Sequence, residues 1–443
     1  MENKKIAIFA NYSLGSPPFE LHNGLIEKLK AKNHVTVYLC NASIKGCTPN
    51  PTKEYFTCRY CISRQALYRE LHPEVEFKIL PDLAAVKSQG VSNAIIESLD
   101  LSAMSSVASY TRCTDESDLN VAWKKTLRGL EETSQSLFSY FVTEIEQFKF
   151  DAICTFNGRF VEAKPVIEAA KFCKIEFGVV EVKKSVNPIF FMNELIHSID
   201  ANTRRAFQFY LADIRKARKN ADKFFSSKIQ NISTGDPIYT KDQVKGTLPR
   251  DLDTSKKIIT IYPSSDDEYK FIGKEWDGIV PHSQIEEISA LIANISDSEF
   301  QVIIKMHPNQ AKTAGNVLQQ YYELQSTFCN AVVEAPESKV DSYELLFKSD
   351  IVVNFASTIG VEANYFGKVV VMIGDTNFSR MKIGYQTYTG KEAAQLISEG
   401  GLDDICDGKS QARRHNEVIK KYLFCSCQKF SIVAEEERID TIV

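Results

Sequence analysis

Short apolar runs alternate along this chain with longer segments in which apolar residues recur every three or four positions. The runs are typical of strands buried on both faces, and the longer segments are typical of amphipathic helices. Such alternation predicts parallel sheets that are covered by helices. In the first half we expect strands at 5–10, 34–40, 151–156 and 176–181, and helices at 19–32, 117–148 and 161–171.

The alternation resumes after a basic and then a polar stretch. Residues 202–228 have a helical pattern rich in Lys and Arg, and residues 231–256 are polar with two Gly and two Pro, as is typical of a linker. The segments that follow predict a doubly wound domain. There we expect strands at 257–262, 300–306, 331–333, 351–355 and 368–373, and helices at 284–295, 311–324, 342–347 and 360–366.

A chain of 443 residues is too long for one ordinary core and suits two domains of roughly 200 residues. We therefore predict an α/β protein of two doubly wound, Rossmann-like domains. The expected N-terminal domain is 1–240 and the C-terminal domain is 241–409. The remainder, 410–443, begins with an amphipathic helix at 410–422 that we expect to pack back on the N-terminal domain.

Charge and hydropathy limit the classes of function. The net charge of -4 and the pI near 6.1 argue against a nucleic-acid-binding protein, which usually has a basic face. No apolar run approaches the ~20 residues that a membrane span needs, and the residues before the first strand are too few for a signal peptide. We expect a cytoplasmic protein.

Eleven cysteines form an odd, scattered set, unlike a secreted disulfide framework. Four of them, Cys40, Cys47, Cys58 and Cys61, lie close together in the sequence, and the last two have the two-residue spacing of a zinc knuckle. The irregular spacing upstream and the place of Cys40 at the end of a predicted strand argue against zinc. Reduced thiols are the default expectation, with a structural zinc site as the alternative.

Two predicted strands end in residues that suit phosphate. The strand at 300–306 runs through Lys305 to His307 and a Pro that turns the chain out of the sheet. The strand at 351–355 is followed by Ser357 and Thr358 and then by a helix. In an open parallel sheet, strand ends and helix N-termini line the ligand crevice and attract anions. Strand alternation leaves open whether Lys305 points to the ligand or to solvent.

The loop after the strand at 257–262 also faces the predicted crevice. Ser264 and Ser265 suit phosphate or sugar contacts, and Asp266, Asp267 and Glu268 supply candidate general bases or form a surface turn. The acids are consecutive rather than spaced as Asp-x-Asp, so we infer no divalent metal at this loop.

On the N-terminal side, Asn157 and Arg159 follow the strand at 151–156. Arg159 could bind an anionic acceptor sugar or a lipid-linked phosphate. In the alternative interpretation, these residues form a turn into the next helix, with Asn157 as the helix cap and Arg159 in solvent. The first strand is followed by residues 11–16, which contain one Gly where a dinucleotide fingerprint needs three. A dehydrogenase is therefore disfavoured.

The two predicted domains resemble the GT-B class of nucleotide-sugar glycosyltransferases, most specifically over residues 262–375. His307-Pro308 resembles the HP motif of bacterial sialyltransferases, capsule Kdo transferases and teichoic-acid polymerases that use CDP-glycerol. Ser357-Thr358 resembles the paired hydroxyl motif of those families. Glu362 is similar in position to the carboxylate that holds the nucleotide ribose in many GT-B enzymes and in the UDP-GlcNAc 2-epimerases.

The resemblance implies a bacterial transferase that builds capsule or lipopolysaccharide. Its donor would be a CMP-, UDP-, GDP- or CDP-linked sugar, with no other cofactor required, and its acceptor a glycan or a lipid-linked glycan. The resemblance also implies that His307 contacts the leaving phosphate. It further implies that the protein makes peripheral contact with the inner membrane or with an assembly complex. Two alternatives stay open: a UDP-GlcNAc 2-epimerase-like isomerase, which shares the fold, and a non-catalytic polysaccharide-assembly protein.

Overall fold

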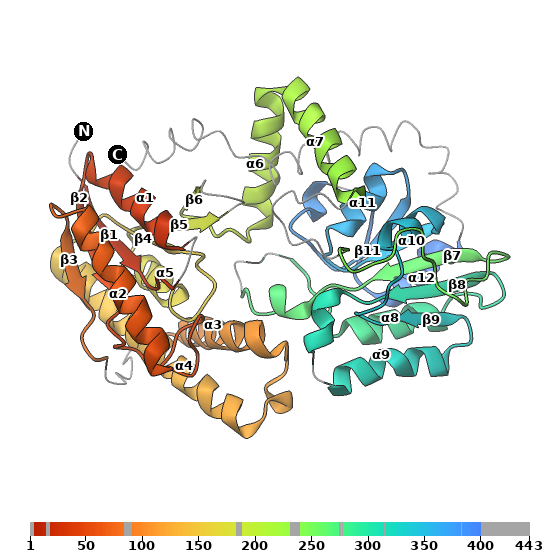
Figure 1. The fold of residues 1–443 in the computed structure, drawn as a ribbon, viewed down its shortest axis with the longest axis horizontal. Helices are drawn as coiled ribbons and strands as arrows, with labels where there is room; N and C mark the ends of the chain where they lie inside the picture. Colours follow the sequence, from red (N-terminus) through yellow and green to blue (C-terminus); the bar gives the residue numbers. More distant parts are fainter. Residues whose placement is uncertain are drawn as a thin grey trace. The chain divides into compact units, whose positions relative to one another are not determined.

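The computed structural model describes residues 4–14, 18–83, 91–182, 188–230, 240–273, 276, 278–313, 315–381 and 383–399. Contacts divide these residues into two compact units, shown in Figure 1. Unit 1 comprises residues 4–198 and the short segment 267–273. Unit 2 comprises residues 199–266 and the described residues from 276 onward.

Unit 1 is built on a sheet with the order β3-β2-β1-β4-β5-β6 among the residues described. All neighbouring pairs are parallel except β5 and β6, which are antiparallel. The four strands predicted for this half are confirmed, and β3 and β6 add an edge on either side. The elements are β1 Lys5–Ala10, α1 Pro18–Lys30, β2 His34–Leu39, α2 Tyr55–Leu71, β3 Glu76–Ile79, α3 Asn93–Thr111, η1 Glu116–Asp118, α4 Val121–Phe148, β4 Ala152–Phe156, α5 Lys164–Phe172, β5 Glu176–Val182 and β6 Pro188–Met192.

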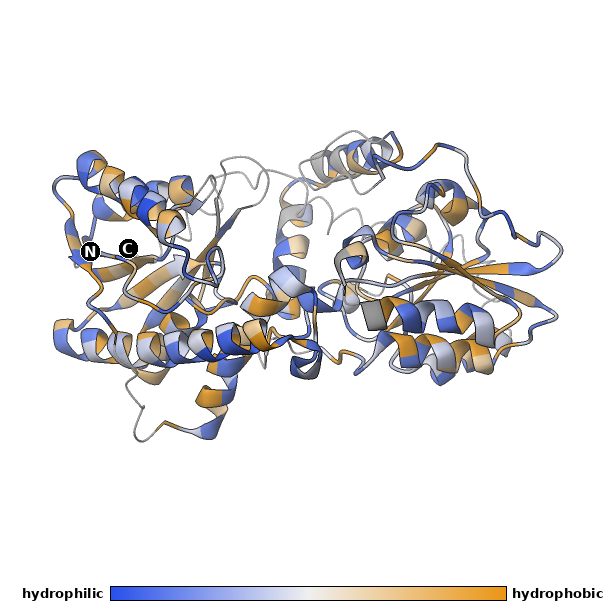
Figure 2. Cartoon of the chain, turned by 60° about the horizontal axis from the view of Figure 1, so that its bottom comes forward, coloured by the Kyte–Doolittle hydropathy of each residue, from blue (hydrophilic) through white to orange (hydrophobic). Residues whose placement is uncertain are grey.

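Helices cover both faces of this sheet. On one face Ile6, Ile8 and Val37 pack with apolar residues of α1 and with Tyr68 of α2. On the other face Phe9 contacts Phe141 of α4, with ring centroids 5.1 Å apart. Burial on both faces explains why these strands are continuous apolar runs, which are orange in Figure 2.

Unit 2 repeats the same strand order, but its last strand is parallel to its neighbour. Its described strands have the order β12-β11-β10-β7-β8-β9, and all neighbouring pairs are parallel. The five predicted strands are confirmed, and β12 extends the edge. The elements are α6 Ile199–Ala212, α7 Ile214–Ile229, β7 Lys257–Tyr262, η2 Asp266–Glu268, α8 Gln284–Ala293, β8 Phe300–Lys305, η3 Pro308–Lys312, α9 Gly315–Thr327, β9 Ala331–Glu334, α10 Ser342–Lys348, β10 Ile351–Asn354, α11 Ile359–Tyr365, β11 Val369–Ile373, η4 Ser379–Met381, β12 Tyr385–Thr387 and α12 Gly390–Ser398.

The second sheet also has two covered faces. Ile261, Ile304 and Val353 belong to a large core with α8, α9 and α12. Ile258 and Ile303 point to the opposite face and pack with Leu345 of α10. Figure 1 shows α8 and α9 on one side of this sheet and α10 on the other. The predicted doubly wound α/β class is therefore confirmed for both units.

The boundary between the units differs from the predicted one after residue 240. Helices α6 and α7 belong to unit 2, so unit 1 ends at Ser198. The reason is aromatic packing: Phe225 of α7 stacks on Tyr365 of α11 with a centroid separation of 3.8 Å, and the Tyr365 hydroxyl donates to Asp222 at 2.7 Å. The amphipathic helix expected at 410–422 lies outside the described residues.

Besides β6, the elements α2, α3 and β3 of unit 1 were not predicted. The buried residues of helix α3 are mostly small or carry hydroxyl groups, with Leu99, Met104 and Val107 among them, so no continuous apolar stripe is visible in the sequence. Strand β3 has four half-buried or exposed residues at an edge, and α2 buries only two of its seventeen residues. Hydrophobic periodicity cannot detect such elements because they bury little apolar surface. In the part of the chain covered by the structure, no helix is both long and apolar enough to cross a bilayer.

Candidate functional site

A row of polar side chains crosses the carboxyl edge of the unit 2 sheet. Asn354 of β10 pairs with Tyr262 of β7, and Lys305 of β8 pairs with Glu334 of β9. Ile261 of β7 pairs with Ile304 of β8, so the next residues of the two strands, Tyr262 and Lys305, lie side by side. The strand order reverses between β7 and β10. Open α/β sheets bind ligands at this reversal, so the row stands where a ligand is expected.

Lys305 is buried in this row, with an exposed fraction of 3%. Its Nζ has no hydrogen-bond partner among the described residues. Burial lowers the pKa of Lys305 to about 8, although Glu334 and Glu337 favour its charged form. An ammonium held in this way is costly unless an anion pairs with it. The solvent-facing alternative for Lys305 is therefore wrong, and its amine can serve a bound anion.

Asn354 was not identified from the sequence, although it is a polar end to an apolar strand. It is fully buried, and neither its amide nitrogen nor its amide oxygen has a partner in the described part of the chain. A Cβ added to Gly360 would lie 2.6 Å from the Asn354 amide nitrogen, so the first turn of α11 covers this amide closely. A buried amide without partners indicates a ligand or water that completes its hydrogen bonds.

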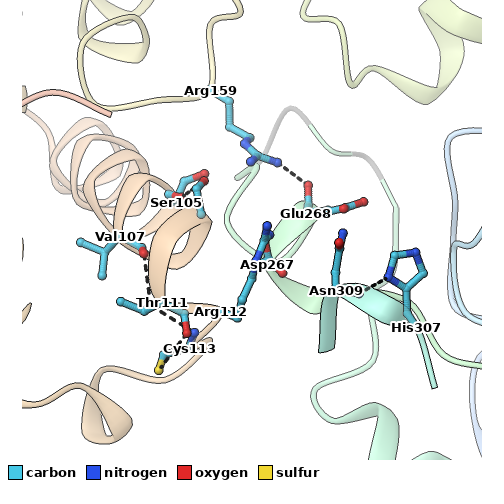
Figure 3. Close-up of polar contacts among 11 residues, drawn as sticks. Ser105, Val107, Thr111, Arg112, Cys113, Arg159, Asp267, Glu268, His307 and Asn309 are labelled. Carbon is cyan, nitrogen blue, oxygen red and sulfur yellow. Dashed lines mark hydrogen bonds and ion pairs between the residues drawn. The ribbon is translucent and has the colours of Figure 1, made fainter. Parts of the chain in front are cut away.

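His307 caps the short helix η3 directly after β8. Its Nδ1 accepts a hydrogen bond from the Asn309 N–H at 3.1 Å, drawn in Figure 3, and the Gln310 side chain accepts from the His307 N–H at 2.7 Å. Because Nδ1 is the acceptor, the proton of the neutral ring is on Nε2. The ring is therefore held with Nε2–H as a donor, as phosphate contact requires.

The loop after β7 is organised by Gln284. The Gln284 side chain accepts from the Ser264 N–H at 3.0 Å and donates to the Ser264 carbonyl at 3.2 Å and to Asp266. Ser264 and Ser265 are both buried. The loop is thus fixed against the start of α8, and Asp266 is hydrogen-bonded to an amide.

The hydroxyl motif and Glu362 lie together at the start of α11. Glu362 is buried, and its carboxylate accepts from the Tyr343 hydroxyl at 2.6 Å and from the Thr358 hydroxyl at 3.5 Å. Ser357 Oγ accepts weakly from the Ile359 N–H at 3.5 Å. The predicted ribose carboxylate is therefore already held by two hydroxyl groups, one of which belongs to the predicted phosphate motif.

In unit 1, Asn157 and Arg159 form a tight turn after β4. Asn157 has a φ of 63°, donates to Glu181 at 2.6 Å and accepts from the Arg159 N–H at 3.2 Å. Helix α5 begins with Ala163 as its cap, so the helix-cap alternative for Asn157 is wrong. The Arg159 guanidinium donates to the Glu268 carbonyl, as Figure 3 shows.

The predicted acid run is divided between the units. Asp266 belongs to unit 2, whereas Asp267 and Glu268 pack with unit 1. Asp267 is 3% exposed and forms an ion pair with Arg112, which follows α3. Sequence reasoning did not single out Arg112, because its partner is more than 150 positions away.

Glu162 is a second residue that the sequence did not reveal. It is 1% exposed, and its Oε2 accepts from the N–H and the hydroxyl of Thr48 at 3.0 and 2.9 Å. Its Oε1 has no partner within the described ranges, and burial raises its pKa. A buried carboxyl with a raised pKa is a candidate for proton transfer. The only sequence signal is a charged residue inside an apolar run.

The four clustered cysteines are free thiols that surround one small cavity in unit 1. No group of three or more His, Cys, Asp or Glu side chains in the described ranges is placed to hold a metal ion. The zinc alternative therefore has no support in this arrangement.

No family model and no curated protein matches this chain. Solved structures similar to it include a UDP-GlcNAc 2-epimerase from Neisseria meningitidis bound to UDP-GlcNAc (14% identity, 98% of both chains, TM-score 0.31) and the β-Kdo 2,4 transferase of KpsC from Thermosulfurimonas dismutans (10% identity, 62% of this chain and 79% of that chain, TM-score 0.38). The calicheamicin glycosyltransferase CalG4 is another (10% identity, 99% and 98%, TM-score 0.31). Likenesses at this level do not define an activity. The two doubly wound units themselves agree with the GT-B class predicted from the sequence.

Proposed function

We propose that this protein is a glycosyltransferase that moves a sugar from a nucleotide-activated donor to a growing surface glycan of the capsule or lipopolysaccharide type. The observation that carries the proposal is Lys305: a buried ammonium with no hydrogen-bond partner among the described residues, at the edge where the strand order of unit 2 reverses. A donor diphosphate or monophosphate would supply the missing anion.

In this proposal unit 2 stabilises the leaving phosphate. The negative charge that develops there is met by the Lys305 ammonium and by the Nε2–H of His307, whose orientation is fixed before the donor binds. Ser264, Ser265, Ser357 and Thr358 contact the phosphate or the nucleotide, and Glu362 contacts the ribose. Hydrogen bonds from Tyr343 and Thr358 orient the Glu362 carboxylate for that role.

Unit 1 holds the acceptor, with Asn157 and Arg159 as contacts. The predicted base is Asp266, Asp267 or Glu268, and of these Asp267 is already engaged in an ion pair with Arg112. The structure adds Glu162 as a candidate base, since its free carboxylate oxygen and raised pKa suit removal of a proton from an acceptor hydroxyl.

A nucleotide screen tests this function. CMP, UDP, GDP and CDP are titrated into the full chain by calorimetry, and one of them should bind clearly. Lys305→Met should weaken that binding by about 10- to 100-fold, as expected for a lost charged hydrogen bond. Lys348→Met, at an exposed lysine on α10, is the matched control and should change nothing.

Absence of nucleotide binding, or equal binding by the wild type and Lys305→Met, would overturn the proposal. Product analysis with the matching nucleotide sugar then decides the reaction: transfer to an added glycan supports the glycosyltransferase, whereas conversion of the donor to its 2-epimer assigns the isomerase alternative.

A further inference from the structure

A small cavity lies at the carboxyl edge of the unit 1 sheet, and Glu162 is near one of its lining residues, because it accepts from Thr48 next to Cys47. It is bounded by the residues after β1, by the loop after β2 and by the first half of α2, and its volume is about 30 Å³. That volume is room for roughly two or three water-sized groups. Cys40, Cys47, Cys58 and Cys61 all line it, together with Asn11.

The cavity wall is mostly apolar, with Asn50, Lys53 and Thr57 at its polar part. Leu14, Ile44 and Ile62 contribute aliphatic groups, and the four thiols contribute sulfur. Burial raises the pKa of Cys61 to about 11 and raises the pKa of Cys40, so these thiols are protonated at neutral pH. A protonated buried thiol behaves as a small hydrophobic group.

Asn11 differs from Asn50, the other amide of the wall, whose side chain is hydrogen-bonded to Glu54 and Cys58. Asn11 follows β1, lines the cavity and is 2% exposed. Neither Nδ2 nor Oδ1 has a hydrogen-bond partner within the part of the chain that is described. Burying an amide without hydrogen-bond partners lowers stability. A ligand with one donor and one acceptor close together would satisfy both the oxygen and the nitrogen of this side chain.

Only a few ligand groups match both features. A secondary amide presents an N–H and a C=O that suit the Asn11 amide, and an acetyl methyl suits a thiol-lined cavity with room for a few heavy atoms. A plain hydroxyl would leave the apolar wall uncovered, and a longer acyl chain would exceed the volume.

We propose that this cavity binds the acetamido group of an N-acetylated sugar, with Asn11 as its hydrogen-bonding partner and the four thiols around its methyl group. Strand β1 borders the strand-order reversal of unit 1, where a sugar can reach the sheet edge. That this sugar is the glycosyl acceptor rests on the proposed function, whereas the binding site itself does not.

Alkylation of the cysteines measures occupancy without any assay of activity. The full chain is treated with N-ethylmaleimide, and the rate at each cysteine is followed by mass spectrometry with and without N-acetyl-D-glucosamine. Ligand at ten times its Kd should slow alkylation of Cys58 and Cys61 about tenfold. D-Glucose and N-butanoyl-D-glucosamine should not. Exposed Cys329 in unit 2 is the internal control and should react at the same rate throughout.

Two substitutions test the assigned contacts. Asn11→Ala removes the amide but keeps the cavity, and Asn11→Leu fills it; both should weaken protection by about tenfold or more. Buried Cys154 should stay unreactive in each variant, which reports that the sheet is folded. Asn33→Ala, a half-buried amide after α1, is the matched control.

Equal protection by glucose and by N-acetylglucosamine, or full protection in Asn11→Ala, would overturn the site. Stoichiometric zinc that is lost in Cys58→Ser and Cys61→Ser would overturn it as well, because the thiols would then be ligands. Nucleotide binding is measured in the same sample to separate the two proposals. Protection of the thiols without nucleotide binding supports the cavity site and contradicts the proposed function. Nucleotide binding without protection of the thiols supports the proposed function and contradicts the cavity site.

Discussion

The two sheet edges of this protein have the same strand order and different chemistry. Both units reverse their strand order at the centre of the sheet. At that edge unit 2 carries a buried ammonium and an oriented imidazole, whereas unit 1 carries neutral thiols, a buried amide and a buried carboxyl. Topology therefore determines where a ligand can bind, and the few residues after each strand determine which ligand it is.

The edges also share one feature. Asn11 and Asn354 are each buried with no amide partner among the residues described, one after β1 and the other at the end of β10. Buried polar groups without partners are uncommon in folded proteins. Because such a group lowers the stability of the unbound protein, its presence at both edges indicates that each unit binds a ligand there.

The largest expected effect is on the imidazole of unit 2. His307→Ala should lower transfer turnover by about 100-fold or more, because it removes a donor aimed at the leaving phosphate, and the fold should be unchanged by circular dichroism. His282→Ala, at an exposed histidine of the same unit, is the control. Equal turnover in the two variants would remove His307 from the chemistry.

Lys305 predicts a pH dependence that unit 1 should not show. Its folded pKa of about 8 lies below the ordinary lysine value of about 10.4. Between these values the unfolded chain binds a proton that the folded chain lacks, so this residue makes stability rise with pH there, and its burial penalty is fully present below about pH 8. Measured by urea unfolding, the stability of the wild type relative to Lys305→Met should rise over this pH range, because both proteins share the opposing titration of the buried thiols.

Nucleotide affinity should change in the opposite direction over the same range. As Lys305 loses its proton above about pH 8, phosphate binding should weaken by up to about tenfold per pH unit. Calorimetry at about pH 7 and about pH 9.5 measures this, with Lys348→Met as the control. Equal pH dependence in wild type and Lys305→Met would contradict the assignment.

A crossed pair of asparagine variants separates the two edges. Asn354→Ala should weaken nucleotide binding by about tenfold and leave protection of the unit 1 thiols unchanged, and Asn11→Ala should do the reverse. Neither should lower the melting temperature much, because each removes a buried amide without partners. If either variant weakens nucleotide binding and thiol protection equally, the two sheet edges do not act as separate sites.

The smallest effect is expected at Glu362. Glu362→Gln should raise the apparent KM for the nucleotide-sugar donor. It should also reduce the preference for ribose over deoxyribose nucleotides by about threefold, as expected for one weakened hydrogen bond. Tyr343→Phe removes the hydroxyl that orients the same carboxylate and should have a weaker effect of the same kind. An unchanged preference in Glu362→Gln would make the carboxylate purely structural.

Local pattern was sufficient for the fold class, and it named several residues of the candidate site whose roles stay predictions. Strands such as 5–10 and 351–355 are buried on both faces, so their apolar runs are visible without any tertiary information. Lys305, His307 and the hydroxyl pair were predicted because strand ends have a known position in a parallel sheet. By contrast α3, whose buried residues are mostly small or carry hydroxyl groups, left no periodic signal.

What the sequence determined by itself was therefore the central strands of both sheets, several of the helices that cover them, and the polar residues at the strand ends. Only the tertiary structure decided that Lys305 is buried, that Asp267 is paired with Arg112, that α6 and α7 pack with unit 2, and that four cysteines and Asn11 surround one cavity. The physical reason is range. Strand and helix patterns repeat over a few residues, whereas burial and pairing depend on groups brought together from distant positions, 155 residues apart for Arg112 and Asp267.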